Sequence, residues 1–222
     1  MKTTIFSLLC LLLCSNLACA QTYDTSKETF TRQDTLRGTL SELRSCYDVK
    51  FYDLNLRVKP DEKSITAHNI IHYQVVTDFD KIQIDLFENL EIDAIEIQKG
   101  TELTKLNFTR EGNAVFIDFP TTQKKGTNTQ LKITYHGKPR VAVRPPWDGG
   151  FSWEKDKQGR DWIGVSCEGL GASVWWPNKD HLSDEPDSMR IYCEVPKDLT
   201  CVVNGNLRSK QKLEGDFVGF EW

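Results

Sequence analysis

The residues from Gly164 to Ser188 read GVSCEGLGASVWWPNKDHLSDEPDS, and no other part of the chain departs so far from a strand pattern. The stretch combines glycines, paired tryptophans and many charged residues, and it sets one carboxylate, Glu168, between small residues. This composition predicts a long connection, and distinctive connections often carry function. The alternative is a purely structural loop in which Trp175 and Trp176 cap a core.

On both sides of this loop, apolar and polar residues alternate with a period of two. The pattern is clear at 52–58, and it recurs at 65–75, 82–86, 92–97, 115–119, 131–135 and 191–195. Such segments bury one face of a strand, and Pro120 marks the expected end of the strand at 115–119. Almost no helical periodicity follows residue 46. We therefore predict an all-β fold of antiparallel sheets, packed as a β-sandwich or an open barrel.

The segment 144–150 reads RPPWDGG and interrupts the strand pattern. Its prolines lack a backbone donor and its glycines add freedom, so it is predicted to be a loop. The segments around Trp153 and Trp162 then form the expected arms of a hairpin, with a turn at 155–160.

The first twenty residues have the features of an export signal. Lys2 precedes an apolar run at 5–13, and Ala18-Cys19-Ala20 forms an A-x-A cleavage site. The run is too short to span a bilayer comfortably, and no other long apolar run suggests a transmembrane segment. We expect a periplasmic or secreted protein with a signal peptide at 1–20, a short polar arm at 21–46, extended or partly helical, and a sandwich domain at 47–222. A lipid anchor at Cys19 is the less favoured alternative, because Asn16 stands where such sites carry an aliphatic residue.

Charge and cysteine content bear on the possible binding partners and on disulfide formation. The 222 residues carry a formal net charge of −4, and the charges are interspersed, so nothing indicates a nucleic-acid partner. Four cysteines remain after the predicted signal, and they allow three pairings in an oxidising compartment, among which the sequence does not choose. They are Cys46, Cys167, Cys193 and Cys201.

Two nucleophile patterns near Glu168 are incomplete. Residues 164–168 approximate G-x-S-x-G, but Glu168 replaces the closing glycine, and the tight nucleophile elbow has no room for its side chain. Cys167 would need a histidine base, and His181 is the only candidate nearby in sequence. Neither pattern favours a nucleophilic enzyme.

Several short motifs in this order resemble the N-terminal domain of the zinc aminopeptidases of the aminopeptidase N type, peptidase family M1. The motifs are SCEG at 166–169, WWPNKDH at 175–181 and DEPDS at 184–188, supported by TLRG at 35–38, YDV at 47–49 and VNG at 203–205. The resemblance covers nearly all of the chain after the predicted signal. It implies a saddle-like β-sandwich, and the chain stops before the family's catalytic domain.

The resemblance also implies roles for two residues. Glu168 matches the family's glutamate that accepts hydrogen bonds from the free α-ammonium group of a peptide substrate. A charge-assisted bond of this kind is strong, and an unpaired buried carboxylate disfavours substrates with blocked N-termini. Ser166 stands where several relatives carry an amide that lines the substrate cleft. The DEPDS motif is expected to be a structural turn with its carboxylates pairing nearby.

A zinc-like pattern lies elsewhere in the chain and is not expected to bind metal. His68 and His72 have the spacing of H-E-x-x-H, and Glu91 follows at the family's usual distance for a third ligand. Asn69 replaces the general base, however, and residues four apart on a strand lie about 13 Å from each other. Zinc is therefore expected in the full-length enzyme and not in this chain.

The resemblance thus implies a substrate-anchoring domain whose partners are peptide N-termini and the missing catalytic domain. The chain alone is expected to be inactive. A rival hypothesis is a non-enzymatic secreted β-sandwich that binds protein or carbohydrate through exposed tryptophans. A third is a family member that has lost its catalytic residues. The alternation at 218–222 suggests that the chain stops inside a strand.

Overall fold

The computed structural model describes residues 29–99 and 102–222, so the predicted signal peptide lies outside the described residues. Two compact units divide the chain at Thr31 and Arg32. Of the first unit only the irregular residues 29–31 are described, and the second unit, residues 32–222, is described below. Within the described ranges no helix has the length and apolar character that a bilayer span requires.

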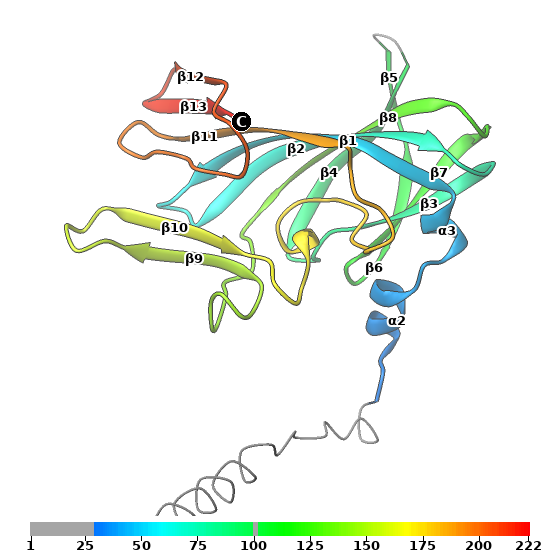
Figure 1. The fold of residues 1–222 in the computed structure, drawn as a ribbon, viewed down its shortest axis with the longest axis horizontal. Coiled ribbons are helices and arrows are strands. Elements are labelled where there is room, and N and C mark those ends of the chain that lie inside the picture. Colours follow the sequence, from blue (N-terminus) through cyan, green and yellow to red (C-terminus); the bar gives the residue numbers. More distant parts are fainter. Residues whose placement is uncertain (1–28, 100–101) are drawn as a thin grey trace, which may run out of the picture. The chain divides into compact units, whose positions relative to one another are not determined.

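The described part is dominated by strands in three sheets, which confirms the predicted all-β class (Figure 1). The largest sheet has the strand order β12-β13-β11-β1-β2-β8-β4-β5. Its strands are β1 (Tyr47–Lys59), β2 (Ser64–Val75), β4 (Leu90–Lys99), β5 (Glu102–Lys105), β8 (Asn128–Gly137), β11 (Ser188–Pro196), β12 (Ser209–Lys212) and β13 (Phe217–Glu221).

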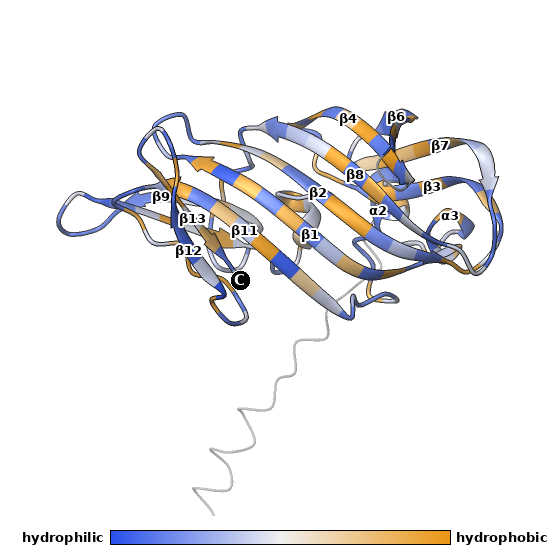
Figure 2. Cartoon of the chain, turned by 90° about the horizontal axis from the view of Figure 1, so that it is seen from above, coloured by the Kyte–Doolittle hydropathy of each residue, from blue (hydrophilic) through white to orange (hydrophobic). Residues whose placement is uncertain are grey.

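Two smaller sheets lie on one side of the large sheet, towards its opposite ends (Figures 1 and 2). One sheet is β3 (Phe79–Asp85), β7 (Ala114–Gln123) and β6 (Asn107–Glu111), in the order β3-β7-β6. The other is the predicted hairpin of β9 (Gly150–Lys155) and β10 (Asp161–Ser166). The loop that follows β10 lies between them. Two short helices, α2 (Arg32–Gly38) and α3 (Glu42–Ser45), precede β1.

The core lies between the large sheet and these smaller sheets. Alternate residues of β1 and β2 are buried, and Figure 2 shows the resulting bands of hydropathy along the strands of the large sheet. From the three-stranded sheet, Ile82, Ile84, Val115 and Ile117 join the same cluster. The period-two pattern therefore predicted correctly which side chains are buried.

The strand pairs are antiparallel with one exception among the described strands. β1 and β11 pair in parallel, from Phe51 opposite Ser188 to Arg57 opposite Glu194. Parallel neighbours cannot be joined by a tight turn and need a long connection. The loop between β10 and β11 forms the last part of the connection that brings β11 alongside β1.

One predicted strand boundary was wrong. β7 does not end at Pro120 but continues to Gln123, which pairs with Phe79. The register shifts between Phe79 and Lys81, and the proline lies opposite this irregularity. Because a bulge leaves a residue unpaired, a proline without an N–H donor is tolerated there.

A buried ion pair joins the α3 helix to the three-stranded sheet. Arg44 of α3 is fully buried and donates to both carboxylate oxygens of Asp85, each at 2.6 Å. Asp85, the last residue of β3, is 4% exposed and also accepts a hydrogen bond from the Gln83 side chain at 3.1 Å. Burial raises the pKa of the Asp85 carboxyl, and the Arg44 guanidinium opposes that shift. The carboxylate therefore depends on its partners to remain charged in the interior.

Replacing Asp85 with asparagine should destabilise the domain strongly. The substitution keeps the side-chain shape but leaves the buried guanidinium of Arg44 without a counter-charge. Breaking a buried ion pair in this way typically costs about 3–5 kcal/mol. Urea denaturation, followed by circular dichroism, measures the free energy of unfolding.

The matched control is Asp118→Asn. Asp118 pairs with Lys81 at 3.0 Å, but both side chains are more than 40% exposed. Exposed pairs contribute at most about 1 kcal/mol, so the control should change the free energy of unfolding little. Equal losses in the two variants would contradict the structural role of the Arg44–Asp85 pair.

Candidate functional site

The long connection predicted within residues 164–188 joins two sheets. It starts at Ser166, the last residue of β10, which pairs with Gly150, and it ends at Ser188, the first residue of β11. Its only regular element is the short 3-10 helix η2 (Ala172–Val174). The loop covers the inner face of the large sheet, because it contacts side chains of β1, β2 and β8 that belong to the buried face.

The tryptophan pair of the loop packs into the core. Trp176 is 8% exposed and meets the ring of Tyr52 edge to face, with ring centroids 4.8 Å apart. Trp175 is partly buried, and its carbonyl accepts a hydrogen bond from the Tyr135 hydroxyl at 3.2 Å. Both residues thus fit the structural interpretation, whereas Trp147 of the preceding loop is 72% exposed.

Polar contacts fix the middle of the loop against β3 and β2. The backbones of Asn178 and Asp85 exchange two hydrogen bonds, of 3.1 and 2.8 Å, in an isolated antiparallel bridge. The side chain of Asn69 donates to the carbonyl of Pro177 at 2.8 Å. Asp85 also accepts a hydrogen bond from the backbone N–H of Asp180 at 3.2 Å. The carboxylate that pairs with Arg44 therefore holds the loop as well.

A second buried ion pair closes the end of the loop. The Nζ atom of Lys179 lies 2.6 Å from an Asp184 carboxylate oxygen, and both side chains are only 4% exposed. Lys179 also donates to the carbonyl of Tyr47 at 2.7 Å, and Asp184 accepts from the Val49 N–H at 3.0 Å. These contacts confirm the structural role predicted for the acidic turn at 184–188.

Glu168 lies in a tight turn at the start of the loop. The N–H of Gly171 donates to the carbonyl of Cys167 at 2.8 Å, and the N–H of Leu170 donates to the carbonyl of Glu168 at 2.9 Å. Gly169 and Gly171 have backbone φ values of +74° and +77°. Residues other than glycine rarely adopt this positive-φ conformation. The sequence EGLG thus provides glycine at the two positions where the turn requires it.

One hydrogen bond from outside the turn holds it, and a neighbouring carboxylate fixes the residue that follows it. The guanidinium of Arg37, in α2, donates a hydrogen bond to the carbonyl of Gly169. The Asp180 carboxylate accepts from the hydroxyl and the N–H of Ser173, at 2.5 and 3.2 Å, and a Cβ added at Gly171 would overlap it. The sequence patterns did not reveal these roles of Arg37 and Asp180, although both residues lie in motifs noted above.

The Glu168 side chain is exposed and meets no hydrogen-bond or ion-pair partner among the described residues. Its carboxylate can therefore accept hydrogen bonds from a cationic group of another molecule. Ser166 is half-buried two residues earlier, at the edge of the same turn. The two predicted site residues thus lie on the same short segment, where β10 ends and the turn begins.

The neighbouring Cys167 has the environment of a packed thiol. Burial is the main effect on the Cys167 thiol and raises its pKa. The His181 ring pairs with the Ser183 hydroxyl at 2.9 Å. A raised pKa reduces the thiolate fraction that a nucleophile needs, so the geometry does not favour Cys167 as one.

The histidine pair on β2 lies on the other face of the large sheet. His68 and His72 follow the strand prediction, while Asn69 between them is buried and binds the loop. Burial lowers the pKa of both imidazoles. Within residues 29–99 and 102–222, no cluster of three or more His, Cys, Asp or Glu side chains could hold a metal ion. The donor set described here does not fit a catalytic zinc ion.

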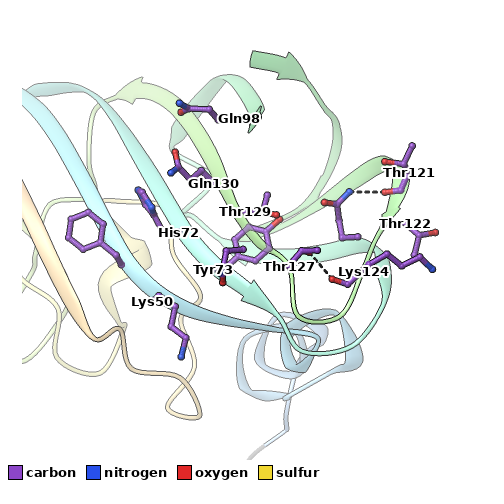
Figure 3. A pocket seen from close by; sticks show the side chains of 13 residues that line it. Lys50, His72, Tyr73, Gln98, Thr121, Thr122, Lys124, Thr127, Thr129 and Gln130 are labelled. Carbon is purple, nitrogen blue, oxygen red and sulfur yellow. Dashed lines mark hydrogen bonds between the residues drawn. The ribbon is translucent and has the colours of Figure 1, made fainter. Parts of the chain in front are cut away.

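A polar groove is present near His72 (Figure 3). Gln98 and Gln130 line it together with threonines of β7 and β8, and two lysines lie at its border. Both lysines are paired: Lys50 with Asp48 at 2.5 Å, and Lys124 with Asp78 at 2.8 Å. The groove contains none of the residues predicted for the site.

Comparison with known proteins identifies relatives of this domain. A variant of a two-domain M1 zinc metallopeptidase bound to L-tryptophan has a TM-score of 0.63 and 18% identity, and the match covers 79% of this chain and 39% of that chain. A variant from Deinococcus radiodurans bound to a Tyr-Ser-Ala substrate has a TM-score of 0.63 and 18% identity, with 79% and 38% covered. The M1 zinc metallopeptidase of the same organism has a TM-score of 0.62 and 19% identity, with the same coverage.

At these identities the structural likeness establishes the fold alone, and the chain spans less than two fifths of the length of these solved chains. No curated protein matches the sequence. The family model described as the peptidase M1 N-terminal domain, however, matches residues 49–222. This chain therefore belongs to the peptidase M1 family, of which it contains the N-terminal domain.

Proposed function

We propose that this chain is the substrate-anchoring domain of an exported zinc aminopeptidase, in which Glu168 binds the α-ammonium group of a peptide substrate. The observation that carries the proposal is that the Glu168 carboxylate is exposed and has no partner among residues 29–99 and 102–222, while hydrogen bonds fix the turn that bears it. A fixed carboxylate binds a primary ammonium group through short charge-assisted hydrogen bonds. Because the N-terminus is held at a fixed position, the same peptide bond, one residue in from the end, would be placed for cleavage in each substrate.

The surroundings of Glu168 suit contact with a second domain. Exposed apolar side chains occur in the segments that precede the turn, Val143 and Trp147 in the loop before β9 and Trp162 on β10. The segment that carries Trp147 packs against the turn, because a Cβ added at Gly149 would lie 2.8 Å from Leu170 Cβ. Such apolar surface is typical of a site covered by another protein surface. We assign it to the catalytic domain.

The reaction would take place on that domain and not on this one. In M1 enzymes a bound zinc ion activates a water molecule for attack on the peptide bond. The part of this chain assigned here binds and orients the substrate, and Ser166 would line the cleft beside the anchor. Two solved M1 relatives are bound to L-tryptophan and to a Tyr-Ser-Ala substrate, which are compounds with a free amino group. These ligands support the proposal that this chain also binds a free amino terminus. Export through the segment 1–20 belongs to the same proposal.

The rival hypothesis, a binding module for protein or carbohydrate, would use exposed tryptophans such as Trp147. It gives no reason for a Glu168 carboxylate that lacks a partner among the described residues, or for the hydrogen bond by which Arg37 holds its turn. The aminopeptidase hypothesis accounts for both, and we favour it for that reason.

In the full-length enzyme, Glu168→Gln should lower kcat/KM for aminoacyl substrates about 100-fold or more, equivalent to about 2.7 kcal/mol of transition-state binding. The amide keeps the size of the side chain but removes the charge that binds the ammonium group. Steady-state kinetics with aminoacyl anilides measures the effect. Glu185→Gln, at an exposed position of the same loop, is the control and should leave kcat/KM unchanged. Unchanged kinetics for Glu168→Gln would remove this residue from the proposal.

Gly171→Ala should distort the anchor. A side chain at positive φ costs about 1–2 kcal/mol, and overlap with the Asp180 carboxylate adds about 1–3 kcal/mol. Gly159→Ala is a matched control, because Gly159 has a φ of +80° but open space around it. Gly171→Ala should lower both the free energy of unfolding and kcat/KM by more than the control does. Identical effects would show that the contact with Asp180 is unimportant.

The 222-residue chain by itself should not hydrolyse aminoacyl anilides, because its described residues contain no fitting zinc ligand set. Release of the aniline product, with and without a chelator, is the measurement. Robust turnover that the chelator abolishes would contradict the assignment of catalysis to another domain.

A further inference from the structure

Two of the four cysteines outside the predicted signal lie side by side. Cys193 is on β11 and is 4% exposed, and Cys201 follows in the irregular segment after that strand. The two thiol groups interact directly, and each shifts the pKa of the other. Cys193 belongs to the main hydrophobic cluster, and Cys201 packs against it from a half-buried position.

The local fold explains this proximity. The N–H of Leu199 donates to the carbonyl of Pro196 at 2.9 Å, which closes a turn directly after β11. The N–H of Lys197 donates to the carbonyl of Asp216 at 2.8 Å and attaches this turn to the segment before β13. The chain therefore reverses between the two cysteines. Cys193 itself lies opposite Leu56 of β1 and Phe220 of β13, so its backbone is held from both sides.

The other two cysteines have different surroundings. Cys46 is buried beside Tyr47 at the start of β1, where burial raises the pKa of its thiol to about 11. Cys167 is half-buried in the loop, where burial raises the pKa of its thiol. Of the three pairings that the sequence allows, the tertiary structure thus supports only one bond.

We propose that Cys193 and Cys201 form a disulfide in an oxidising compartment, while Cys46 and Cys167 remain thiols. The oxidant is an external disulfide, such as glutathione disulfide or an oxidised protein dithiol. The Cys201 thiolate attacks one sulfur of that disulfide and releases the first thiol. The Cys193 thiolate then attacks the Cys201 sulfur of the mixed disulfide and releases the second.

The reaction is balanced by these two exchanges. Two thiols of the chain are oxidised to one disulfide, the external disulfide is reduced to two thiols, and the two protons pass to the released thiols. Cys201 is suited to the first attack because it is half-buried rather than fully buried. The interaction with Cys193 also lowers the pKa of the Cys201 thiol, which increases the reactive thiolate fraction.

The bond would join the segment after β11 to the interior of the large sheet. A disulfide stabilises mainly by restricting the unfolded chain, and short loops gain less than long ones. Because only seven residues, 194–200, separate the two cysteines, we expect a rise in Tm of about 5 °C on oxidation. The proposal is independent of Glu168 and of any peptidase activity.

The test uses the purified 222-residue chain, reduced and then incubated with glutathione disulfide. Free thiols are alkylated, the protein is digested and the peptides are identified by mass spectrometry. We expect one linked pair that contains Cys193 and Cys201, with alkylated Cys46 and Cys167. Peptides with the cysteines of residues 1–20 are identified separately by mass. Alkylation of both Cys193 and Cys201 after oxidation, or a link of either to another cysteine, would overturn the proposal.

Two variants provide the matched comparison. Cys201→Ser changes the half-buried partner and should abolish both the linked peptide and the dependence of Tm on a dithiol reductant. Cys167→Ser changes another half-buried cysteine and should preserve both. A Tm that responds equally to the reductant in the two variants would also contradict the disulfide. The peptide map of the unmodified chain decides the matter even if a variant fails to fold.

Discussion

The arrangement of the domain depends on the interactions of the buried Asp85 carboxylate. It binds the fully buried Arg44 with both oxygens, and it accepts a backbone hydrogen bond from Asp180 in the loop. A charge in an apolar interior is stable only when it is paired and hydrogen-bonded. Because the buried Asp85 carboxylate needs these hydrogen-bond partners, α3, β3 and the loop meet around it. The turn that bears Glu168 belongs to the same loop.

The acidic residues around the site divide into two groups with different tasks. Asp85, Asp180 and Asp184 are satisfied by contacts within the domain, and they fix the loop. Glu168 is exposed and has no partner among the described residues. A preorganised site needs a rigid support and an unsatisfied group that meets the ligand. The first three carboxylates provide such a support, and Glu168 is the group that we propose meets the ligand.

Topology explains why a long loop is present at this place. β1 and β11 are parallel neighbours, so the chain must return along the sheet before β11 can pair with β1. The loop from Ser166 to Ser188 completes this return over the inner face of the large sheet. A connection that the fold requires can hold a functional side chain at little extra cost, because core contacts such as those of Trp176 already immobilise it.

The sequence by itself determined the local features: the all-β class, the buried face of each long strand, the hairpin and the loop that bears Glu168. These follow from periodicity, from glycine and proline positions and from short motifs, all of which act within a few residues. Only the tertiary structure decided that β11 runs parallel to β1, that β7 continues past Pro120, that Arg37 holds Gly169, and which cysteines meet. The physical reason is that these contacts join residues brought together by strand pairing and chain reversal, and no local pattern specifies which distant groups become neighbours.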